Sequence, residues 1–406
     1  MQVPDPPPDS THPVAILGAG HVGLVTAVGF AHHGIPVRVG EANPERLAVL
    51  QAGGVPFHEP GIAPLVSNCV ASGTLTFHAS NAEAADGAVA VFLAVPTPAG
   101  LDGSADLGAV HAAIRSIAGV TVDSTVIVIK SSVPPGSSHR IRAWMEESGC
   151  AGSLAINPEF LQEGRAVEGA LSPTRVVIGS NDPVAAEVVA RLHAPFNAPV
   201  VMTDPASAEL TKYAANSYLA MRVTFANTIA NLADVVGADI ADVVEGIGLD
   251  PRIGSQFLRP GPGYGGSCFP KDLPALIATA AERGLDLDLL QAVVDVNAAQ
   301  IDRVVGKLTD GLETLDGRKV ALLGLAFKAD TDDLAESPAI HLAAALVAAG
   351  ASVSAYDPAV GTAVPGIQQA VSALEAMEGA DAVLIATEWP DFALLDLDEV
   401  AAVLKG

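Results

Sequence analysis

The stretch Val14–Gly23 reads V-A-I-L-G-A-G-H-V-G, an apolar run followed by a turn with three glycines, Gly18, Gly20 and Gly23. The apolar run predicts a strand, the residues from about 22 to 33 predict a helix, and V-R-V-G at 37–40 predicts a second strand. Together these elements form a βαβ unit. In this context the three glycines are typical of a turn that binds the pyrophosphate of a dinucleotide at a helix N-terminus.

Glu41 closes the second predicted strand, 18 residues after Gly23. A carboxylate at this position can accept hydrogen bonds from both ribose hydroxyls, and it repels the 2′-phosphate of NADP. The motif therefore favours NAD as the cofactor. A glycine-rich turn in a βαβ unit that binds no nucleotide is the alternative.

Further apolar segments continue the pattern along the first half of the chain. They lie, with helical sequence between them, at 88–95, 125–130, 153–157 and 175–179. Such alternation predicts a parallel sheet with helices on its faces. We therefore expect residues 13–203 to form a Rossmann-like NAD-binding domain.

One long helix is predicted from Ala206 to Val236, since Asp204 can cap it, Pro205 suits its first turn, and the interval has no glycine or proline. It should dominate a central helical domain, residues 204–300. At 320–324, V-A-L-L-G repeats the V-A-I-L-G of 14–18 without the other phosphate-loop glycines. The sequence thus predicts an α/β protein in which a central helical domain joins two Rossmann-like parallel-sheet domains, the second at 301–406 and without dinucleotide binding.

Composition narrows the class of partner. The 406 residues carry 21 Lys and Arg against 46 Asp and Glu, a formal net charge of −25, which argues against nucleic acid and anionic membranes and favours a small molecule. No apolar run approaches the ~20 residues of a membrane span. Residues 1–12 are proline-rich and lack the features of a signal peptide, so we expect a disordered leader. Three cysteines, an odd number, without an export signal favour the cytoplasm.

The segment Gly261–Asp272, G-P-G-Y-G-G-S-C-F-P-K-D, contains a candidate nucleophile, Cys268. Its glycines would let the backbone approach a ligand closely, and Pro270 suits the first position of the helix that follows. The helix N-terminus and Lys271 would both lower the pKa of a thiol there. A small buried hydrophobe is the alternative, and we assign that role to Cys69 and Cys150, which have no such surroundings.

Two further groups of polar residues could serve the same chemistry. Glu209, Lys212 and Asn216 share one face of the long helix, where a lysine and an asparagine can hold an alkoxide or carbonyl oxygen; a solvated helix face is the alternative. N-P-E-F-L-Q-E-G-R at 157–165 follows a strand end, where ligand sites of α/β proteins lie, and offers Glu159 and Glu163. Its alternative is an ordinary polar loop.

These motifs together resemble the UDP-glucose/GDP-mannose dehydrogenase family from about Val14 to Phe392. The resemblance rests on segments in the family's order: V-P-T-P (95–98), K-S-S-V-P-P-G (130–136), N-P-E-F-L-Q-E-G-R-A-V (157–167), A-E-L-T-K-Y-A-A-N-S (208–217), D-P-R-I-G (250–254), F-L-R-P-G-P-G-Y-G-G-S-C-F-P-K-D (257–272) and G-L-A-F-K-A-D-T-D-D (324–333). It implies an NAD domain, a central dimerisation domain and a C-terminal domain for the nucleotide of a UDP-sugar, and hence a homodimer. We expect no metal.

The resemblance also implies the reaction, in which a primary alcohol at C6 of the sugar is oxidised twice, to the carboxylate, with two NAD reduced. Cys268 would attack the intermediate aldehyde, and the resulting thiohemiacetal would be oxidised to a thioester. Lys212 and Asn216 would stabilise the oxyanion, Asp272 would take part in proton transfer, and Glu159 would activate the hydrolytic water.

Two sets of binding residues follow from the same resemblance. The expected cofactor contacts are Gly18, Gly20, Val22, Gly23, Glu41, Arg46, Thr97, Ser132, Glu163 and Lys271, with Ser132 also in the catalytic group. The expected substrate contacts are Glu159, Phe160, Leu161, Gln162, Glu163, Lys212, Asn216, Arg252 from a neighbouring subunit, Phe257, Leu258, Arg259, Pro260, Gly261, Gly265 and Lys328.

Three residues depart from the family pattern. Ser132 replaces a threonine, Glu41 replaces an aspartate, and Ala335 replaces an arginine expected to face NAD. The segments E-G-R-A-V (163–167) and G-G-S-C-F-P-K-D (265–272) favour UDP-glucose as the substrate. The alternatives are the same chemistry on GDP-mannose or a UDP-N-acetylhexosamine, or a protein that binds NAD or a nucleotide sugar without catalysis.

Overall fold

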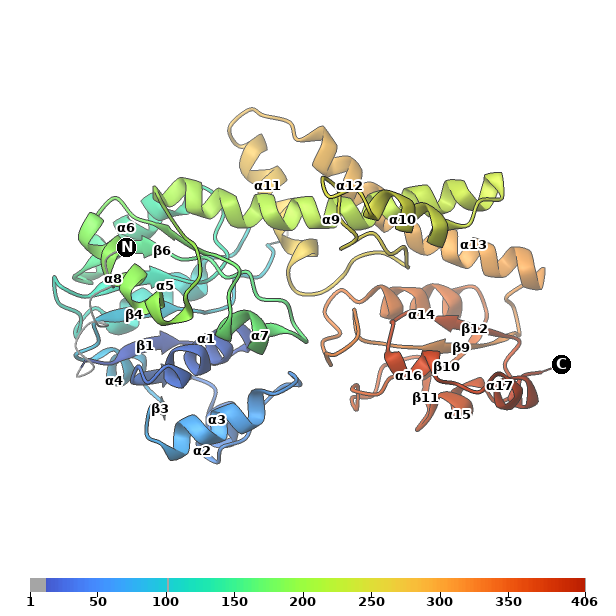
Figure 1. The fold of residues 1–406 in the computed structure, drawn as a ribbon, viewed down its shortest axis with the longest axis horizontal. Coiled ribbons are helices and arrows are strands. Elements are labelled where there is room, and N and C mark those ends of the chain that lie inside the picture. Colours follow the sequence, from blue (N-terminus) through green and yellow to red (C-terminus); the bar gives the residue numbers. More distant parts are fainter. Residues whose placement is uncertain (1–11, 101, 406) are drawn as a thin grey trace. The chain divides into compact units, whose positions relative to one another are not determined.

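The structure, a computed structural model, describes residues 12–100 and 102–405, so the predicted leader falls outside it except for His12. The chain divides into two compact units between Ala214 and Ala215. Figure 1 shows their helices and strands. Each unit contains one sheet, and the long helix α9 (Pro205–Val236) begins in the first unit and ends in the second.

The first unit is built on an eight-stranded sheet of order β3-β2-β1-β4-β5-β6-β7-β8. Its strands are β1 (Val14–Leu17), β2 (Val37–Gly40), β3 (Leu75–His78), β4 (Ala90–Leu93), β5 (Val126–Ile129), β6 (Ser153–Ile156), β7 (Val176–Gly179) and β8 (Val200–Thr203). Its helices are α1 (His21–His32), α2 (Pro44–Gln51), α3 (Ile62–Ala71), α4 (Asn81–Ala85), α5 (Gly108–Ile117), α6 (Ser137–Ser148), α7 (Ala166–Leu171) and α8 (Pro183–His193), with a 3-10 turn η1 at Ala194–Phe196.

The predicted strands of this unit are confirmed, but the sheet is not parallel throughout. β3, β2, β1, β4, β5 and β6 pair in parallel, whereas β7 runs antiparallel to β6 through the single register pair Ile156 and Gly179. β8 then pairs with β7 in parallel. An antiparallel neighbour needs no crossover helix, which is why the short helix α7 suffices between β6 and β7.

Core residues lie on both faces of this sheet because side chains alternate along each strand. On β1, Val14 and Ile16 belong to one apolar cluster, whereas Ala15 and Leu17 belong to another. Both clusters are fully buried at these positions. This explains why the strand reads as a continuous apolar run rather than as an alternating one.

The second unit combines helices with a parallel four-stranded sheet of order β11-β10-β9-β12. Its strands are β9 (Lys319–Leu323), β10 (Ser352–Tyr356), β11 (Gln368–Gln369) and β12 (Ala382–Ile385). Its helices, besides the end of α9, are α10 (Ile240–Gly248), α11 (Phe269–Ala281), α12 (Asp288–Ala298), α13 (Gln300–Leu312), α14 (Pro338–Ala348), α15 (Ala373–Met377), α16 (Pro390–Ala393) and α17 (Leu397–Val403). None of the described helices is long and apolar enough to cross a membrane.

The repeat predicted at 320–324 is a strand, β9, but the turn after it differs from the first copy. Three residues separate β1 from α1, whereas the loop 324–337 separates β9 from α14. Asp357, after β10, accepts hydrogen bonds from the N–H groups of Leu325 and Ala326 at 2.7 and 3.0 Å. The loop after β9 thus has no short glycine turn that leads directly into a helix N-terminus, which is the feature that suits a pyrophosphate after β1.

Candidate active site

The glycine turn after β1 is shaped by two of its three glycines. A Cβ at Gly18 would lie 2.7 Å from the carbonyl oxygen of Ala94, and one at Gly23 would lie 1.9 Å from the carbonyl oxygen of Gly18. At Gly20 a Cβ would meet no atom within 4 Å, and no side chain caps α1 there. The turn thus packs tightly on its own chain while leaving the helix N-terminus open at Gly20, which suits a pyrophosphate.

Glu41 lies buried beside this turn and holds it. Its carboxylate accepts hydrogen bonds from the N–H groups of Ala19 at 3.0 Å and Asn43 at 2.7 Å, and Arg46 Nη1 lies 3.4 Å away. These contacts place a carboxylate next to the turn that would hold a dinucleotide. The residues present therefore fit an NAD without a 2′-phosphate.

Lys212 and Glu159 form a buried ion pair, with Lys212 Nζ 2.7 Å from Glu159 Oε1. Burial alone would raise the pKa of Glu159, but the Lys212 ammonium and the N–H of Leu161 outweigh it and lower the pKa. The N–H of Leu161 donates to Glu159 Oε2 at 2.6 Å. Lys212 is 3% exposed, so the alternative of a solvated helix face is wrong, as is that of an ordinary polar loop for Glu159, which is 6% exposed.

Two more cations, Lys130 and Arg175, lie near Glu159, and neither was among the predicted site residues. Lys130 Nζ donates to Asn157 Oδ1 at 3.0 Å, and burial lowers the pKa of Lys130 to about 8. The Arg175 guanidinium lies 3.7 Å from the centre of the Phe160 ring. The strand-end position of Asn157 and Phe160 was the available signal, but spacing along the chain did not indicate which cations would approach them.

Glu209, on the same helix as Lys212, holds the segment that carries Ser132. Its carboxylate accepts hydrogen bonds from the N–H groups of Gly136 at 2.6 Å and Ser138 at 2.7 Å, at the start of α6. Burial is the main cause that raises the pKa of Glu209 to about 7. Ser132 itself is half-buried within the loop that Glu209 anchors.

Glu59, which sequence reasoning missed, joins the glycine turn to the Q-E-G-R loop. Its buried carboxylate accepts hydrogen bonds from the N–H groups of Gly164 and Ala166, both at 2.7 Å, and lies 2.9 Å from His21 Nε2. Burial alone would raise the pKa of Glu59, but His21 and these donors hold it below its usual range. Glu163 is half-buried in this loop and Gln162 is exposed, while Thr97 is buried elsewhere in the unit.

In the second unit, Cys268 is the N-cap residue of α11 and is partly exposed. The helix begins at Phe269, so Pro270 occupies its second position rather than the predicted first. Cys69 and Cys150 are buried, as expected. Nucleophilic cysteines are typically partly exposed and lie at the N-terminus of a helix, as Cys268 does.

Asp272 lies one turn after Cys268 and is fully buried. Asn216 Nδ2 donates to Asp272 Oδ2 at 2.7 Å, and Lys271 Nζ donates to Asp272 Oδ1 at 2.5 Å. Both carboxylate oxygens therefore have a donor from a residue that the sequence had singled out. Lys271, predicted to act on the thiol and the cofactor, has its contact here.

The prediction that the glycines before Cys268 let the backbone approach a ligand is wrong for three of them. A Cβ would lie 2.9 Å from Asn297 Oδ1 at Gly263, 2.2 Å from the Glu336 carbonyl oxygen at Gly265, and 2.7 Å from the Phe327 ring at Gly266. Their small size admits atoms of the protein itself rather than a ligand. Gly261 alone among these four has nothing within 4 Å of a Cβ.

The remaining predicted substrate residues form less of a cluster. Arg252 is exposed and pairs with Asp250 at 2.6 Å, and Arg259 is exposed and pairs with Glu388 at 2.9 Å. The others differ in burial: Leu258 is buried, and Phe257, Pro260 and Lys328 are half-buried, as are Leu161 and Val22 in the first unit. Phe257 has a φ of 60°, a left-handed backbone that costs a non-glycine residue energy.

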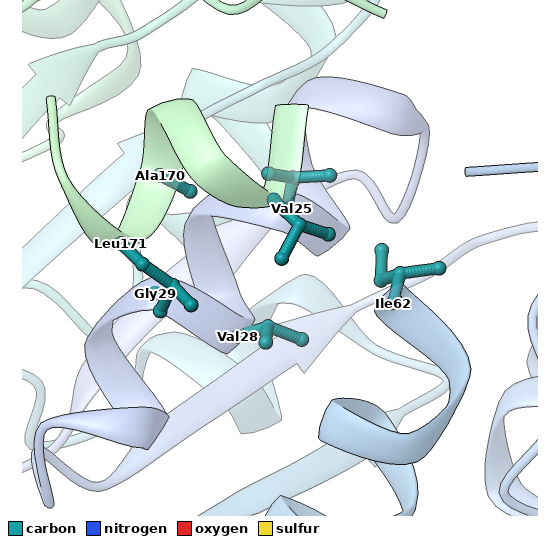
Figure 2. Close-up of a pocket in the computed structure, with 7 residues that line it drawn as sticks. Val25, Val28, Gly29, Ile62, Ala170 and Leu171 are labelled. Atoms are coloured by element: carbon teal, nitrogen blue, oxygen red, sulfur yellow. The ribbon is translucent and has the colours of Figure 1, made fainter. Parts of the chain in front are cut away.

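An apolar crevice between α1, α3 and α7 is not a candidate site. Figure 2 shows the carbon side chains that line it, and it has no room for a water-sized molecule. The lining residues are Val25, Val28, Gly29, Ile62, Val167, Ala170 and Leu171. With no polar group in this lining, the crevice is a packing gap of the core.

The described part of the chain contains no group of three or more His, Cys, Asp or Glu side chains that could hold a metal.

Comparison with known proteins places this arrangement in a family. Residues 12–197 match the NAD binding domain of the UDP-glucose/GDP-mannose dehydrogenase family, residues 206–299 its central domain and residues 321–406 its UDP binding domain. The chain is 42% identical to the UDP-glucose 6-dehydrogenase of Rhizobium meliloti (strain 1021) over 406 residues, covering 97% of this chain and 93% of that protein.

Two solved structures are similar to this one. A UDP-glucose dehydrogenase from the hyperthermophilic archaeon Pyrobaculum islandicum has a TM-score of 0.91 and 38% identity, covering 96% of this chain and 93% of that one. The UDP-D-ManNAc dehydrogenase from Pyrococcus horikoshii has a TM-score of 0.88 and 27% identity, covering 97% and 93%. With three family domains matched in order, this chain belongs to the UDP-glucose/GDP-mannose dehydrogenase family.

Proposed function

We propose that this protein oxidises UDP-glucose to UDP-glucuronate in two NAD-dependent steps through a covalent bond to Cys268. The observation that carries the proposal is the partly exposed thiol at the N-cap of α11, one turn before the buried Asp272. UDP-glucose is favoured because the two proteins above that are named for that substrate are 42% and 38% identical to this chain, against 27% for the UDP-D-ManNAc enzyme.

The first unit would hold the cofactor. The open N-terminus of α1 at Gly20 would bind the pyrophosphate, and Glu41 the ribose hydroxyls, with Arg46, Thr97, Ser132 and Glu163 as further contacts. NAD, when bound, accepts a hydride from the substrate carbon in each oxidation. The remaining chemistry belongs to side chains of this protein.

We propose that Lys212 and Asn216, which lie one helical turn apart on α9, stabilise the negative charge that develops on the C6 oxygen. After the first oxidation the Cys268 thiolate adds to the aldehyde carbon, forming a C–S bond. Loss of hydride from this thiohemiacetal gives a thioester. Water then breaks the C–S bond, returning the thiol and releasing the carboxylate, so two NAD and one water are consumed for each alcohol oxidised.

Asp272 and Glu159 would divide the proton transfers. Asp272, with Asn216 and Lys271 as donors to its carboxylate, is held beside the thiol segment. Glu159 is held as a carboxylate by Lys212, and a carboxylate whose pKa is lowered is a weaker base. Its first role is therefore to fix and balance the charge of Lys212, and it activates the hydrolytic water as Lys212 turns to the substrate oxygen.

The substrate's nucleotide would bind in the second unit. Residues 321–406 match a UDP binding domain, and within it Lys328 offers a cation for the diphosphate. We propose that the backbone of Phe257–Gly261 and of Gly265 contacts the same nucleotide. Phe160, Leu161 and Gln162 remain expected contacts of the sugar.

We also propose that two chains form a homodimer through the part of α9 from Tyr218 to Leu232. Tyr218, Phe225 and Leu232 recur every seven residues and are 53, 50 and 56% exposed. A stripe with this period lies on one side of a helix and is typical of a helix–helix interface. Arg252, exposed in the single chain, could then reach the partner's substrate. The three free cysteines suit a reducing cytoplasm.

A panel of nucleotide sugars tests the proposal. UDP-glucose, UDP-N-acetylglucosamine, UDP-N-acetylmannosamine and GDP-mannose are each supplied with NAD, and NADH is followed by absorbance. We expect the highest kcat/KM with UDP-glucose and a charged sugar product. Higher kcat/KM on another sugar would reassign the substrate, and binding without NADH would identify a non-catalytic protein.

A further inference from the structure

A side-chain amide fixes the backbone four residues before Cys268. The N–H of Tyr264 donates to Asn297 Oδ1 at 2.8 Å, and Asn297 Nδ2 donates to the Tyr264 carbonyl oxygen at 3.2 Å. One planar amide on α12 thus pairs with both polar groups of one residue, as a neighbouring β-strand would. Such a two-point contact fixes rotation as well as position.

A second amide pair holds the backbone at Gly261. Its N–H donates to Asn227 Oδ1 on α9 at 2.7 Å, and its carbonyl oxygen accepts from Gln300 Nε2 on α13 at 3.1 Å. Asn231 Nδ2 in turn donates to Gln300 Oε1 at 3.0 Å, which orients that amide. Asn227 and Gln300 are 1 and 5% exposed, so water does not compete for these bonds.

The glycine content of the segment makes these contacts necessary. A glycine-rich stretch has more backbone freedom than any other, and without restraints the thiol at its end would sample many positions. Gly263 also allows Asn297 to reach Tyr264, because a Cβ there would lie 2.9 Å from Asn297 Oδ1. A third restraint follows at Gly266, whose N–H donates to the Ala335 carbonyl oxygen at 2.9 Å.

We propose that Asn297 is a positioning residue for the thiol of Cys268, with Asn227 and Gln300 supporting it. The proposal rests on the proposed function, in which the Cys268 thiolate attacks the aldehyde carbon of the substrate. Asn297 would act by fixing the backbone at Tyr264, with which its amide forms two hydrogen bonds. Nucleophilic addition is sensitive to this, since a displacement of about 1 Å can slow a reaction by about a hundredfold.

The test compares Asn297→Ala with Gln291→Ala, a matched control on the same helix whose exposed amide bonds only Asp295 within the described residues. Steady-state NADH formation gives kcat and the KM for UDP-glucose. In parallel, the rate of iodoacetamide alkylation at Cys268 is followed by peptide mass spectrometry. Alkylation needs no substrate, so it reports on the thiol segment even if UDP-glucose is not turned over.

We expect Asn297→Ala to lower kcat by about tenfold to a hundredfold with little change in KM, while Cys268 is alkylated several-fold faster because the freed segment exposes it. Gln291→Ala should match the wild type in both. An unchanged alkylation rate, or a wild-type kcat, in Asn297→Ala overturns the proposal. No NADH from the wild-type protein would reject the proposed function and leave the alkylation comparison to decide the positioning role.

A second variant covers the case in which Asn297→Ala does not fold. Asn297→Asp keeps an acceptor for the Tyr264 N–H and loses the donor to its carbonyl oxygen, so the same two changes are expected at smaller size. Thermal denaturation of each variant identifies those that are folded at the assay temperature. A folded Asn297→Asp with wild-type kcat and alkylation rate contradicts the proposal.

Discussion

Lys212 and Glu159, 53 residues apart in sequence, form a buried ion pair whose Nζ and Oε1 atoms lie 2.7 Å apart. The pair joins α9 to the loop after β6. Removing both charges from water is costly, and their mutual attraction offsets that cost only while both partners are present. Lys212, to which we propose the stabilisation of the oxyanion, is therefore held in a defined place by Glu159.

Glu159→Gln should destabilise the protein strongly, because it leaves the Lys212 ammonium buried without its carboxylate. Loss of one partner of a buried pair costs about 3–5 kcal/mol of unfolding free energy. Glu159→Gln combined with Lys212→Met, which removes both charges, should recover most of that loss. Chemical denaturation measures both, and a wild-type unfolding free energy in the single variant would show that the pair is not strongly coupled.

Lys130 should make stability depend on pH. Its folded pKa is about 8, against 10.5 for the free side chain, and burial is the main cause. Between these values the unfolded chain holds a proton that the folded one has lost, so the unfolding free energy rises with pH, by up to about 1.4 kcal/mol per unit. Below pH 8 the cost of the buried charge is fully present.

The check on Lys130 is a difference measurement. Unfolding free energies of the wild type and Lys130→Met are compared from pH 7.5 to 10, and we expect the wild type to gain stability relative to the variant as the pH rises. Lys405→Met, at an exposed lysine, serves as the control. Parallel curves for the wild type and Lys130→Met contradict the lowered pKa.

Glu41→Gln should weaken the preference for NAD over NADP. The substitution keeps the size of the side chain at the end of β2 and removes the charge that repels a 2′-phosphate. We expect the ratio of kcat/KM for NAD to that for NADP to fall by about tenfold, a change of about 1.4 kcal/mol. Glu45→Gln, on the exposed part of α2, is the control; if the ratio stays at its wild-type value, Glu41 does not face the ribose.

Ala335→Arg should tighten NAD binding. The backbone of Ala335 bonds Asp333 and Gly266, and an arginine leaves both contacts intact. If the new guanidinium reaches a phosphate, we expect a gain of about 1 kcal/mol, several-fold in affinity, after screening by solvent. Calorimetric titration of NAD into Ala335→Arg and the uncharged Ala335→Gln decides it. Equal affinities would show that this loop does not reach the cofactor.

Local patterns predicted most of the fold. The strands that are buried on both faces, such as β1 and β5, read as apolar runs, and α9 is marked by its capping residues and its lack of glycine and proline. The strands that were missed, β3 and β8 in the first unit and β11 and β12 in the second, lie at the edges of their sheets. Val201 and Met202 of β8 are each 51% exposed, so neither burial nor alternation distinguishes that strand from a loop.

The candidate site was predictable in its residues but not in its contacts. Cys268, Lys212 and Asp272 lie in motifs from which they were predicted as site residues. The residues that they contact depend on the fold. Tyr264 and Asn297, for example, are 33 residues apart, and an asparagine near the end of a helix carries no signal of its role. Long-range hydrogen bonds of this kind depend on tertiary packing, which residue spacing does not encode.

Cys268→Ser tests the central claim most directly, because a serine alkoxide is far harder to form than a thiolate at neutral pH. The measurement is the number of NADH formed per UDP-glucose at completion, together with the identity of the product. The account predicts two NADH and UDP-glucuronate for the wild type, and no second oxidation and no UDP-glucuronate for Cys268→Ser. Two NADH per sugar at the wild-type rate in Cys268→Ser would contradict the covalent mechanism.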